Sequence, residues 1–583
     1  MPPAELEPAT ARSKWDTMTT STPNLTIKSV TSSCSSSSNN LNAGCAESLH
    51  SLIDNLEKAE GSPDEQCSMS CSKDKKKRSI CCSRSGQTVW GIIFVLCSIV
   101  GFIFPPLDFM LLEKLNMRPG LPPYDWWADP PDEVRMRAHI FNVTNHERFL
   151  AGLDDKIHVE EIGPIVYLEK LKHYDIKFNE NSTMTYTAKR YLIYLPDENN
   201  IDFNDTIIVP NLALLGMLSY LHNANYFVRT GFKIMVNSHD SQLFVRRTIY
   251  EYLWDNRESI LETSRNLAPT LVPDSNMGML NKIYSDFTDK YTVRIGAQWG
   301  HKNFFKMDAM RGRSYITGYD PNKCPDRLNG ATEGVMYHQH ISKNDILLCL
   351  RKTVCKVMPM YYERESIING VKVYRFALPE NAFDRKRNGT DCYASNAKPL
   401  PDGVSDTSKC FFDFPMVASY PHFYTGSPPK DKYVTGLKPD RSKHSSYIYV
   451  EPITGVPFKA IARLQCNLQI NDLSSFYTPH YNKFSNLILP IGWIEYSQED
   501  LPAVVKHTVY FMVVILPPLS IIMFILLLLL GLYLTIKQFI SQKLKKKILL
   551  LIMRSKKHKI DNLGQNNLFI DEMEIFLNKC ADS

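Results

Sequence analysis

The longest uncharged segment of this chain is TVYFMVVILPPLSIIMFILLLLLGLYLTI, residues 508–536. A second uncharged segment, SGQTVWGIIFVLCSIVGFIFPPL, covers residues 85–107. A helix needs about 20 apolar residues to cross the roughly 30 Å of hydrocarbon in a bilayer, and both segments are longer than that. The sequence therefore predicts two membrane-spanning helices, with residues 108–507 folded between them as one large domain or two fused lobes.

Basic residues flank the outer end of each predicted span. Because Lys and Arg concentrate on the cytosolic side of membrane helices, we expect both termini to be cytosolic and residues 108–507 to be extracellular or lumenal. Residues 1–84 and 537–583 are then cytosolic tails, and the Ser-rich first tail is predicted to be disordered. No cleavable signal peptide is visible at Met1, so the first span is predicted to be an uncleaved signal anchor. The basic residues are Lys75, Lys76, Lys77, Arg78, Arg84, Lys537, Lys543, Lys545, Lys546 and Lys547.

The charge of the chain argues against a nucleic-acid partner. The 583 residues carry a formal net charge of +6, and much of this excess lies beside the predicted membrane spans. A nucleic-acid-binding protein needs a clustered basic face on a folded domain, and the sequence between the spans shows none.

The cysteines of the segment between the spans agree with an oxidising compartment. An even number of cysteines there predicts disulfides, although six cysteines alone allow fifteen pairings. Cys349 and Cys466 stand in apolar surroundings, so they either pair with each other or remain buried thiols that pack like small apolar side chains. The six are Cys324, Cys349, Cys355, Cys392, Cys410 and Cys466.

Two kinds of covalent modification follow from the predicted topology. Asn-x-Ser/Thr sequences on the outer side predict a glycoprotein. Cysteines next to the cytosolic face of the first span predict reversible palmitoylation. The glycosylation candidates are Asn142, Asn181, Asn204 and Asn388, and the palmitoylation candidates are Cys81 and Cys82.

The periodicity of the central segment changes along the chain. Alternating apolar and polar residues predict strands at 135–143, 164–168, 371–376 and 447–450. Between residues 211 and 254 the spacing lengthens toward that of helices, which predicts a helical insert in a strand-rich domain. A further helix is predicted from Lys343 to Val357, ended by Pro359.

No catalytic or metal-binding pattern is present in the sequence. It has no nucleophile elbow, no His-Glu-x-x-His, no phosphate-binding glycine loop and no dinucleotide fingerprint. His338 and His340 form a His-x-His pair, but the pair lacks the other ligands of a stable zinc site. We therefore expect no enzyme, no metal and no cofactor. Protonation of His222, His239, His338 or His340 would suit a low-pH sensor, and the sequence does not select among them.

Several short strings, taken in order between the two spans, resemble the class B scavenger receptor family. This family includes the fatty-acid translocase, the lysosomal integral membrane protein and the insect sensory neuron membrane proteins. The resemblance covers about residues 88 to 540. It rests on Phe141-Asn142-Val143-Thr144-Asn145, Glu161-Ile162-Gly163-Pro164, Asn211-Leu212-Ala213, Arg247-Thr248 with Glu251 and Leu253-Trp254, Tyr374-Arg375-Phe376, Pro421-His422-Phe423, Glu451-Pro452-Ile453-Thr454-Gly455 and Arg463-Leu464-Gln465.

The resemblance implies an α+β fold, in which the two terminal transmembrane helices flank an antiparallel β-barrel-like ectodomain. A small helical bundle caps the apex of such a domain, and an apolar tunnel leads through it toward the bilayer. Each methylene exposed to water costs about 0.8 kcal/mol, so a dry tunnel lowers the barrier to lipid transfer. Residues 211–254 and 343–357 correspond to the apical helices, where we expect ligand binding by Phe227, Arg229, Phe232 and Lys233, with Phe227, Phe232 and Lys233 exposed.

The resemblance also implies a disulfide pattern. It pairs Cys324 with Cys392 and Cys355 with Cys410. The family's third bridge, expected between Cys392 and Cys410, is missing, whereas Cys349 and Cys466 are additional. Where some members carry a lysine pair at the apex, this chain has Ser238-His239-Asp240. Binding of oxidised, anionic lipoproteins by that patch is therefore not expected unless Arg229 and Lys233 replace the lysines.

The leading functional hypothesis is a plasma-membrane receptor that binds fatty acids, sterols or lipoproteins and passes apolar cargo to the bilayer. The alternative within the same fold is a lysosomal or endosomal sorting receptor for a lumenal protein. A two-pass ion channel has the same topology, but channels need polar pore-lining positions. The apolar runs of the spans offer only Ser98, Ser520 and Thr535. An ectoenzyme is disfavoured by the missing catalytic patterns.

Overall fold

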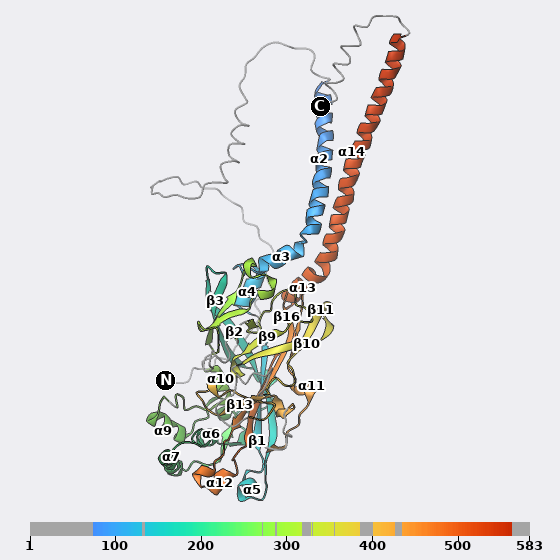
Figure 1. Ribbon diagram of the computed structural model, residues 1–583. Helices are drawn as coiled ribbons and strands as arrows, with labels where there is room; N and C mark the ends of the chain where they lie inside the picture. The colour runs from blue at the N-terminus through green and yellow to red at the C-terminus, as the bar shows by residue number, and fades with distance from the viewer. Residues whose placement is uncertain are drawn as a thin grey trace, which may run out of the picture. The chain divides into compact units, whose positions relative to one another are not determined.

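A computed structural model of the 583-residue chain describes residues 74–130, 134–270, 272–285, 288–316, 328, 330–354, 356–384, 400–425 and 434–561. The chain divides into residues 1–80 and 81–583. Of the first part, only residues 74–80 are described, and they form the start of helix α2 (Asp74–Ile103). The sheet domain and helix α14 belong to the second part (Figure 1).

One large sheet forms the body of the central domain, and nearly all of its neighbouring strands are antiparallel. Its strands follow the order β7-β6-β3-β2-β1-β17-β16-β15-β11-β10-β9-β8, so the first and last strands of the domain lie side by side. Both edges contribute to one hydrophobic cluster, since Met307 of β7 packs in the same cluster as Ala331 of β8. The sheet is therefore nearly closed, as predicted. The bounds are β1 Val134–Val143, β2 Ile157–Phe178, β3 Thr183–Tyr194, β6 Thr288–Arg294, β7 Met307–Met310, β8 Ala331–Thr332, β9 Leu347–Arg351, β10 Lys356–Ile368, β11 Val371–Ala377, β15 Tyr447–Val450, β16 Pro457–Gln469 and β17 Ile488–Gln498.

Close packing at the centre of the sheet requires a glycine. Gly492 of β17 lies opposite Ile140 of β1 and Cys466 of β16. A Cβ at this position would come within 2.6 Å of the carbonyl oxygen of His139 and 2.8 Å of the sulfur of Met279. Only hydrogen fits there, so the strand runs directly against the neighbouring backbone and against helix α10 (Met279–Tyr284).

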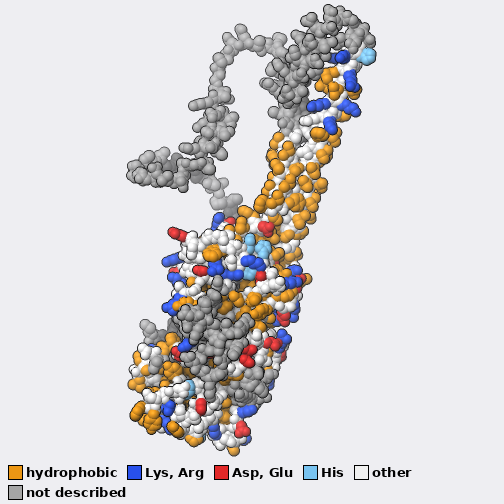
Figure 2. Space-filling view, viewed as in Figure 1, with side chains coloured by type: hydrophobic (Ala, Val, Ile, Leu, Met, Phe, Trp, Pro, Cys, Tyr) orange, Lys and Arg blue, Asp and Glu red, His pale blue; other side chains and the backbone are white. Residues whose placement is uncertain are grey.

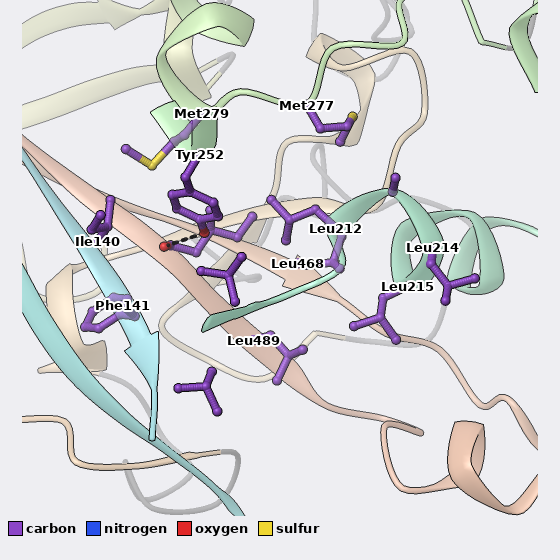
Figure 3. Packing of buried hydrophobic residues seen from close by; sticks show 14 of the residues in the cluster. Ile140, Phe141, Leu212, Leu214, Leu215, Tyr252, Met277, Met279, Leu468 and Leu489 are labelled. Carbon is purple, nitrogen blue, oxygen red and sulfur yellow. Dashed lines mark hydrogen bonds between the residues drawn. The ribbon is translucent and has the colours of Figure 1, made fainter. Parts of the chain in front are cut away.

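Short helices gather at the end of the domain away from α2 and α14 (Leu516–Asp561) (Figure 1). They start where the sequence offers caps: Asn211 and Asn225 accept hydrogen bonds from the first turns, and Thr248 and Glu251 form a capping box. Their apolar faces pack on β1, β16 and β17, as Figure 3 shows for Leu212, Tyr252 and Leu468. The bounds are α6 Leu212–Tyr220, α7 Tyr226–Ser238, α8 Ile249–Trp254 and α9 Ser259–Leu267.

Two segments predicted to be helical contain strands. In the 211–254 insert, Phe244–Thr248 is strand β5, which pairs with β4 (Thr206–Pro210). The helix predicted from Lys343 to Val357 is wrong: β9 and β10 occupy this region, and Pro359 pairs with Leu348 in the ladder. The apolar run around Cys349 has no clear period, and such short runs fit a buried strand as well as a helix. Tertiary pairing decided in favour of the strand.

Helices α2 and α14 are long and apolar enough to cross a membrane, with candidate spans at Gly86–Ile103 and Ala503–His558. They contact each other, because the Ser98 hydroxyl donates a 2.8 Å hydrogen bond to the Phe524 carbonyl oxygen and Gly91 lies against Gly531. Figure 2 shows apolar side chains covering both helices and basic side chains at the far end of α14. Where the membrane begins and ends along them stays a prediction.

Candidate functional site

Two large cavities in the described part of the central domain have mainly apolar walls. The first, which we call the α3/α13 chamber, has a volume of about 480 Å³ and lies between helices α3 (Pro106–Lys114) and α13 (Ala503–Tyr510) and the sheet. The second, the α7/α9 chamber, has a volume of about 1190 Å³ and lies under the helices at the other end. Lys352 borders both chambers, so they approach each other inside the domain.

The α3/α13 chamber reaches from the exposed start of the membrane helices into the sheet. At its mouth lie Phe109 and Met110 of α3, which are both exposed. Further in, the wall includes Ala460 and Ala462 of β16, whose single methyl groups leave space in the cavity. The mouth of the chamber therefore lies beside α3, which contacts α14.

The inner end of the α3/α13 chamber is polar and charged. Arg190 of β3 lies 3.1 Å from Glu169 of β2 and 3.4 Å from Glu333, so one guanidinium serves two buried carboxylates. Tyr186 donates a 2.7 Å hydrogen bond to Glu333 Oε1. Burial opposes ionisation of Glu333, but His173, Arg190 and Tyr186 outweigh it and lower its pKa to about 2. We call this group, with His173, the polar belt.

His173 lies in the polar belt between Trp127 and Glu333. Its Nδ1 lies 2.6 Å from the carbonyl oxygen of Trp127 in α4 (Pro122–Ala128), and its Nε2 lies 3.2 Å from Glu333 Oε1. This Nε2 atom is buried and makes no hydrogen bond to a described residue. Arg190 and the two carboxylates make the belt a mixed-charge cluster at the inner end of an apolar cavity.

Two tyrosine hydroxyls extend the polar belt. The hydroxyl of Tyr284, at the end of α10, lies 3.0 Å from the hydroxyl of Tyr496 and 3.4 Å from Glu169 Oε2. Burial raises the pKa of Glu169, against the opposing effects of Arg190, Arg351 and the Tyr284 hydrogen bond. The belt therefore continues to Tyr284, whose neighbours Ile283 and Ser285 line the α7/α9 chamber.

The α7/α9 chamber is lined by helices on one side and by strands on the other. Its walls include Met235 of α7, Leu261 of α9 and Phe414, with Cys466 and Ile491 from the sheet. Figure 3 shows Met277, Met279 and Tyr252 in this region, with the Tyr252 hydroxyl donating to the Ile491 carbonyl oxygen at 3.0 Å. Flexible Met side chains such as Met235, Met277 and Met279 suit apolar surroundings of varied shape.

The four predicted ligand-binding residues all lie on α7 but face different surroundings. Phe227 is 83% exposed, whereas Phe232 is only 5% exposed and lines the α7/α9 chamber; its predicted surface exposure is wrong because the turn of the helix points it inward. Arg229 donates to the Ala224 carbonyl oxygen at 2.5 Å. Lys233 is half-buried, and its Nζ donates a 3.2 Å hydrogen bond to the Phe476 carbonyl oxygen. Their binding role stays a prediction.

The sequence reasoning missed several exposed apolar residues around Phe227. Tyr226 is 62% exposed, Ile234 is 64% exposed and Tyr477 is 78% exposed. The helical spacing of apolar residues along α7 could have indicated Tyr226 and Ile234. Tyr477 lies far away in sequence, and only the contacts between α7 and the 474–476 turn bring it near.

The cysteines divide into bonded and free groups. Cys410 is disulfide-bonded, while Cys324, Cys355 and Cys392 lie outside the described residues. Both predicted pairings therefore stay predictions. Cys349 of β9 and Cys466 of β16 are free and buried, so the alternative in which they pair with each other is wrong. Three strands separate β9 from β16 in the sheet order, and each thiol packs in its own apolar surroundings.

The predicted modification sites stay predictions, but some are described. Asn181 and Asn204 are exposed, which suits a glycan, whereas Asn142 is half-buried and its Oδ1 accepts from the Ile208 amide at 2.8 Å. Asn388 lies outside the described residues. Cys81 and Cys82 lie within α2.

A cluster of histidines around Glu161 was not predicted. One Glu161 oxygen lies 2.8 Å from His139 Nδ1 and the other 2.6 Å from His422 Nε2. His422 Nδ1 accepts from the Lys438 amide at 3.0 Å, and its ring stacks on His444 with 4.6 Å between centroids. Glu161 and His422 both belong to the short sequences that resemble the family, but the sequence does not indicate that the two side chains are in contact.

The histidines singled out in the sequence occupy other places. His338 is buried, with Nε2 3.8 Å from Asp345 Oδ2, and burial lowers the pKa of both His338 and His340. His222 Nδ1 lies 2.8 Å from the Ser219 carbonyl oxygen, and His239 Nε2 lies 3.0 Å from the Thr263 hydroxyl. Within the part of the chain that the structure describes, no three His, Cys, Asp or Glu residues are grouped as metal ligands.

Replacing His444 with Phe is expected to reduce the loss of stability in mild acid. Burial, reinforced by His422, lowers the pKa of His444 from near 6.5 to about 4. Over that interval the unfolded chain binds more protons than the folded one, so the His444 contribution is complete above pH 6.5 and is lost as pH falls toward 4. Phe keeps the stacking and does not titrate. The melting temperature of the purified chain should fall less between pH 7 and 5 for the variant, by roughly 2–4 °C.

The control for this variant is His480→Phe, because His480 is exposed and its loss should leave the pH dependence unchanged. Equal pH dependence in wild type and His444→Phe would contradict the assignment.

Comparison with known proteins gives concordant results. The sequence model of the CD36 family matches residues 89–542 of this chain. "Scavenger receptor class B member 1" of Cricetulus griseus is 26% identical over 480 residues, which cover 80% of this chain and 91% of that protein. "Lysosome membrane protein 2" of Homo sapiens is 25% identical over 425 residues, which cover 72% of this chain and 86% of that protein.

Proposed function

Because the chain belongs to the CD36 family, we propose that it binds lipids or lipoproteins at its α7 end and passes apolar cargo through its two chambers into the bilayer. This refines the general kind of protein that the family and the relatives indicate, a membrane receptor of the class B scavenger receptor group. The relatives carry receptor and membrane-protein names, which fits a role without catalysis.

The observation that carries the proposal is the pair of chambers. Both have apolar walls, both border Lys352, and one begins beside α3 and α13, at the base of the apolar helices. Each methylene kept out of water is worth about 0.8 kcal/mol, so such a path favours the transfer of a long alkyl chain or a sterol over its release into solvent.

The exposed apolar residues of α7 suit the first step of such a transfer. Tyr226, Phe227 and Ile234 stand in water, where apolar side chains favour contact with a lipid surface or a partner protein. Arg229 and Lys233 on the same helix would attract anionic particles. A lumenal protein docking here, as in a sorting receptor, is the second candidate function.

We place both termini in the cytosol and the sheet domain outside the cell or in a lumen. The two apolar helices α2 and α14 and the basic residues beyond them support this arrangement. Plasma membrane is the proposed location and the lysosomal or endosomal membrane the alternative. Glycosylation, palmitoylation and the two disulfide pairings belong to the same proposal.

The direct test is mass spectrometry of the lipids that co-purify with the full-length chain in detergent. We expect single-chain lipids or sterols to be enriched over the bulk membrane lipid composition, with an unrelated two-span membrane protein as the control. Recovery of bulk phospholipids alone, in the same proportions as in the control, would contradict lipid carriage.

A further inference from the structure

Three lysines lie together on the outer face of the sheet. Lys172 of β2 lies directly opposite Lys189 of β3 in the antiparallel ladder. Lys290 of β6 lies opposite Thr187 on the other side of β3, so it is the diagonal neighbour of Lys189. All three lysines are exposed, and within the part of the chain that the structure describes their ammonium groups make no hydrogen bond or ion pair. We call these three residues the lysine face.

The strand period explains why the three lysines share one face. Successive side chains of a strand point to opposite sides of the sheet. Lys189 follows the buried Ala188, and Lys290 stands between the buried Asp289 and Tyr291. The sequence contains no run of basic residues in these strands, because the lysines stand far apart along the chain. Only the pairing of β2, β3 and β6 brings them together.

An arrangement of like charges on neighbouring strands is unfavourable for the sheet itself. Residues directly opposite in a ladder have Cβ atoms about 5 Å apart, and like charges there destabilise the pair. Other exposed lysines of the domain have acidic partners: Lys343 and Lys372 lie 3.2 and 3.0 Å from Glu365. The acidic residues of the β2–β3 hairpin, Asp175 and Glu180, are both described and form no ion pair with the lysine face. The face therefore has an uncompensated positive charge.

Two exposed tyrosines accompany the lysine face. Tyr174 of β2 lies opposite Thr187 and is 36% exposed, and Tyr191 of β3 lies two residues beyond Lys189 and is 40% exposed. A tyrosine offers a flat apolar ring and a polar hydroxyl. The face thus combines separate cations with aromatic surfaces.

This combination indicates the chemistry of the partner. A lysine ammonium is a compact point charge with three donors, which suits a tetrahedral oxyanion, whereas the arginine fork matches a planar carboxylate. The cations stand on three adjacent strands, which lie about 4.8 Å apart. A linear polymer with an oxyanion on successive sugar units meets several of them at once, and its sugar rings cover the tyrosines.

The position of the lysine face separates it from the lipid path. Strands β2 and β3 extend between the apical helices and α4 (Figure 1), where Phe178 at the end of β2 contacts Tyr124 of α4. The lysines and the two tyrosines line neither chamber. A ligand on this face is therefore outside the α3/α13 and α7/α9 chambers.

We propose that the lysine face binds a sulfated polysaccharide, with sulfate groups on the three lysines and sugar rings against Tyr174 and Tyr191. The inference goes beyond lipid carriage, since it assigns a second ligand to a separate surface. Of the proposed function it needs only the topology in which the sheet domain faces outward. A polysaccharide held here would keep the receptor next to the cell-surface or matrix proteins that carry such chains.

The test measures binding of a fluorescent heparin decasaccharide to intact cells that make no sulfated polysaccharide of their own and express the full-length chain. Bound probe is normalised to surface protein detected by antibody. Intact cells keep the probe away from the basic residues 543–557, which the proposed topology places in the cytosol. We expect saturable binding that weakens as the salt concentration rises. The unsulfated backbone polysaccharide of the same length should compete at least about tenfold less well, because it lacks the sulfate charges.

Variants then assign the binding to the lysine face. Lys172→Gln combined with Lys189→Gln should lower the affinity about tenfold, since two exposed charge contacts are lost, whereas Arg at both positions keeps the charge and should retain most of the binding. The matched control is Lys343→Gln combined with Lys372→Gln, which removes the same charge from another exposed part of the domain and should behave as wild type. Surface protein shows that each variant folds.

The outcomes separate this inference from lipid carriage. If wild type shows no saturable binding, if the unsulfated polysaccharide competes equally, or if the control pair loses as much affinity as the Lys172 and Lys189 pair, the inference is wrong. Lysine-dependent binding of phosphatidylserine vesicles that the decasaccharide does not displace would assign the face to a lipid surface and also overturn it. Lipid uptake by the Lys172 and Lys189 variant should stay at wild-type level, so failure here leaves the proposed function standing.

Discussion

Replacing Ala462 with Trp should reduce lipid uptake by cells to background while leaving the amount of protein at the cell surface unchanged. Ala462 of β16 lies opposite Tyr496 of β17 and lines the α3/α13 chamber. An indole at this point would project into a cavity of about 480 Å³ and fill much of the space that an alkyl chain would use. The measurement is uptake of a fluorescent fatty acid or sterol, normalised to surface protein detected by antibody.

The control for this plug is Ala151→Trp. Ala151 ends helix α5 (His146–Ala151) and is exposed, so the same added volume meets only solvent. Overpacking a buried site costs about 1–3 kcal/mol, and surface detection shows whether Ala462→Trp folds. Ala460→Trp, two residues away on the same wall, is a second plug. Uptake at wild-type level from either plugged variant, with normal surface expression, would count against transfer through the chamber.

Replacing Glu333 with Gln is expected to destabilise the sheet domain strongly. Gln keeps the shape and can still accept from Tyr186, but it removes the charge that faces Arg190 and His173. Removing one partner of a buried charge cluster typically costs about 3–5 kcal/mol, because the opposite charges remain buried. The melting temperature of the purified chain at pH 7 should fall by several degrees.

The pH dependence gives this prediction a second readout. The pKa of Glu333 is lowered to about 2 in the folded chain, so its contribution is complete above the usual value near 4.5 and is lost as pH falls toward 2. Wild type should lose stability over that interval, and Glu333→Gln should lack this part of the loss. Glu380→Gln is the control, since Glu380 pairs with Arg441 in an exposed ion pair worth less than about 1 kcal/mol. Equal melting temperatures for wild type and Glu333→Gln would show that the belt does not stabilise the domain.

The interior of the domain was partly predictable. Alternating residues predicted β1 and part of β2, although Ala138 to Phe141 and Ile165 to Tyr167 are buried on both faces of the sheet. The segment of β9 and the start of β10 was predicted as a helix at the other end of the domain, because four consecutive apolar residues from Leu347 to Leu350 carry no period.

The polar belt and the histidine cluster could not be predicted from patterns in the sequence. Glu169, Arg190 and Glu333 come from β2, β3 and the segment after β8, and His422 meets Glu161 across 261 residues of sequence. Spacing along a chain carries no information about such contacts. They form only when strands pair, because each ladder brings distant residues to within hydrogen-bond distance.

The sequence by itself determined the two apolar helices, the strand-rich domain between them and membership of the family. The length of an apolar segment, its hydropathy and the order of short family sequences can all be read along the chain. Only the tertiary structure decided which cavity lies beside the membrane helices, which α7 side chain points inward and which two carboxylates lie against Arg190. These depend on how strands register and how helix faces rotate. Burial and charge balance are properties of neighbours in space, and the chain order does not contain them.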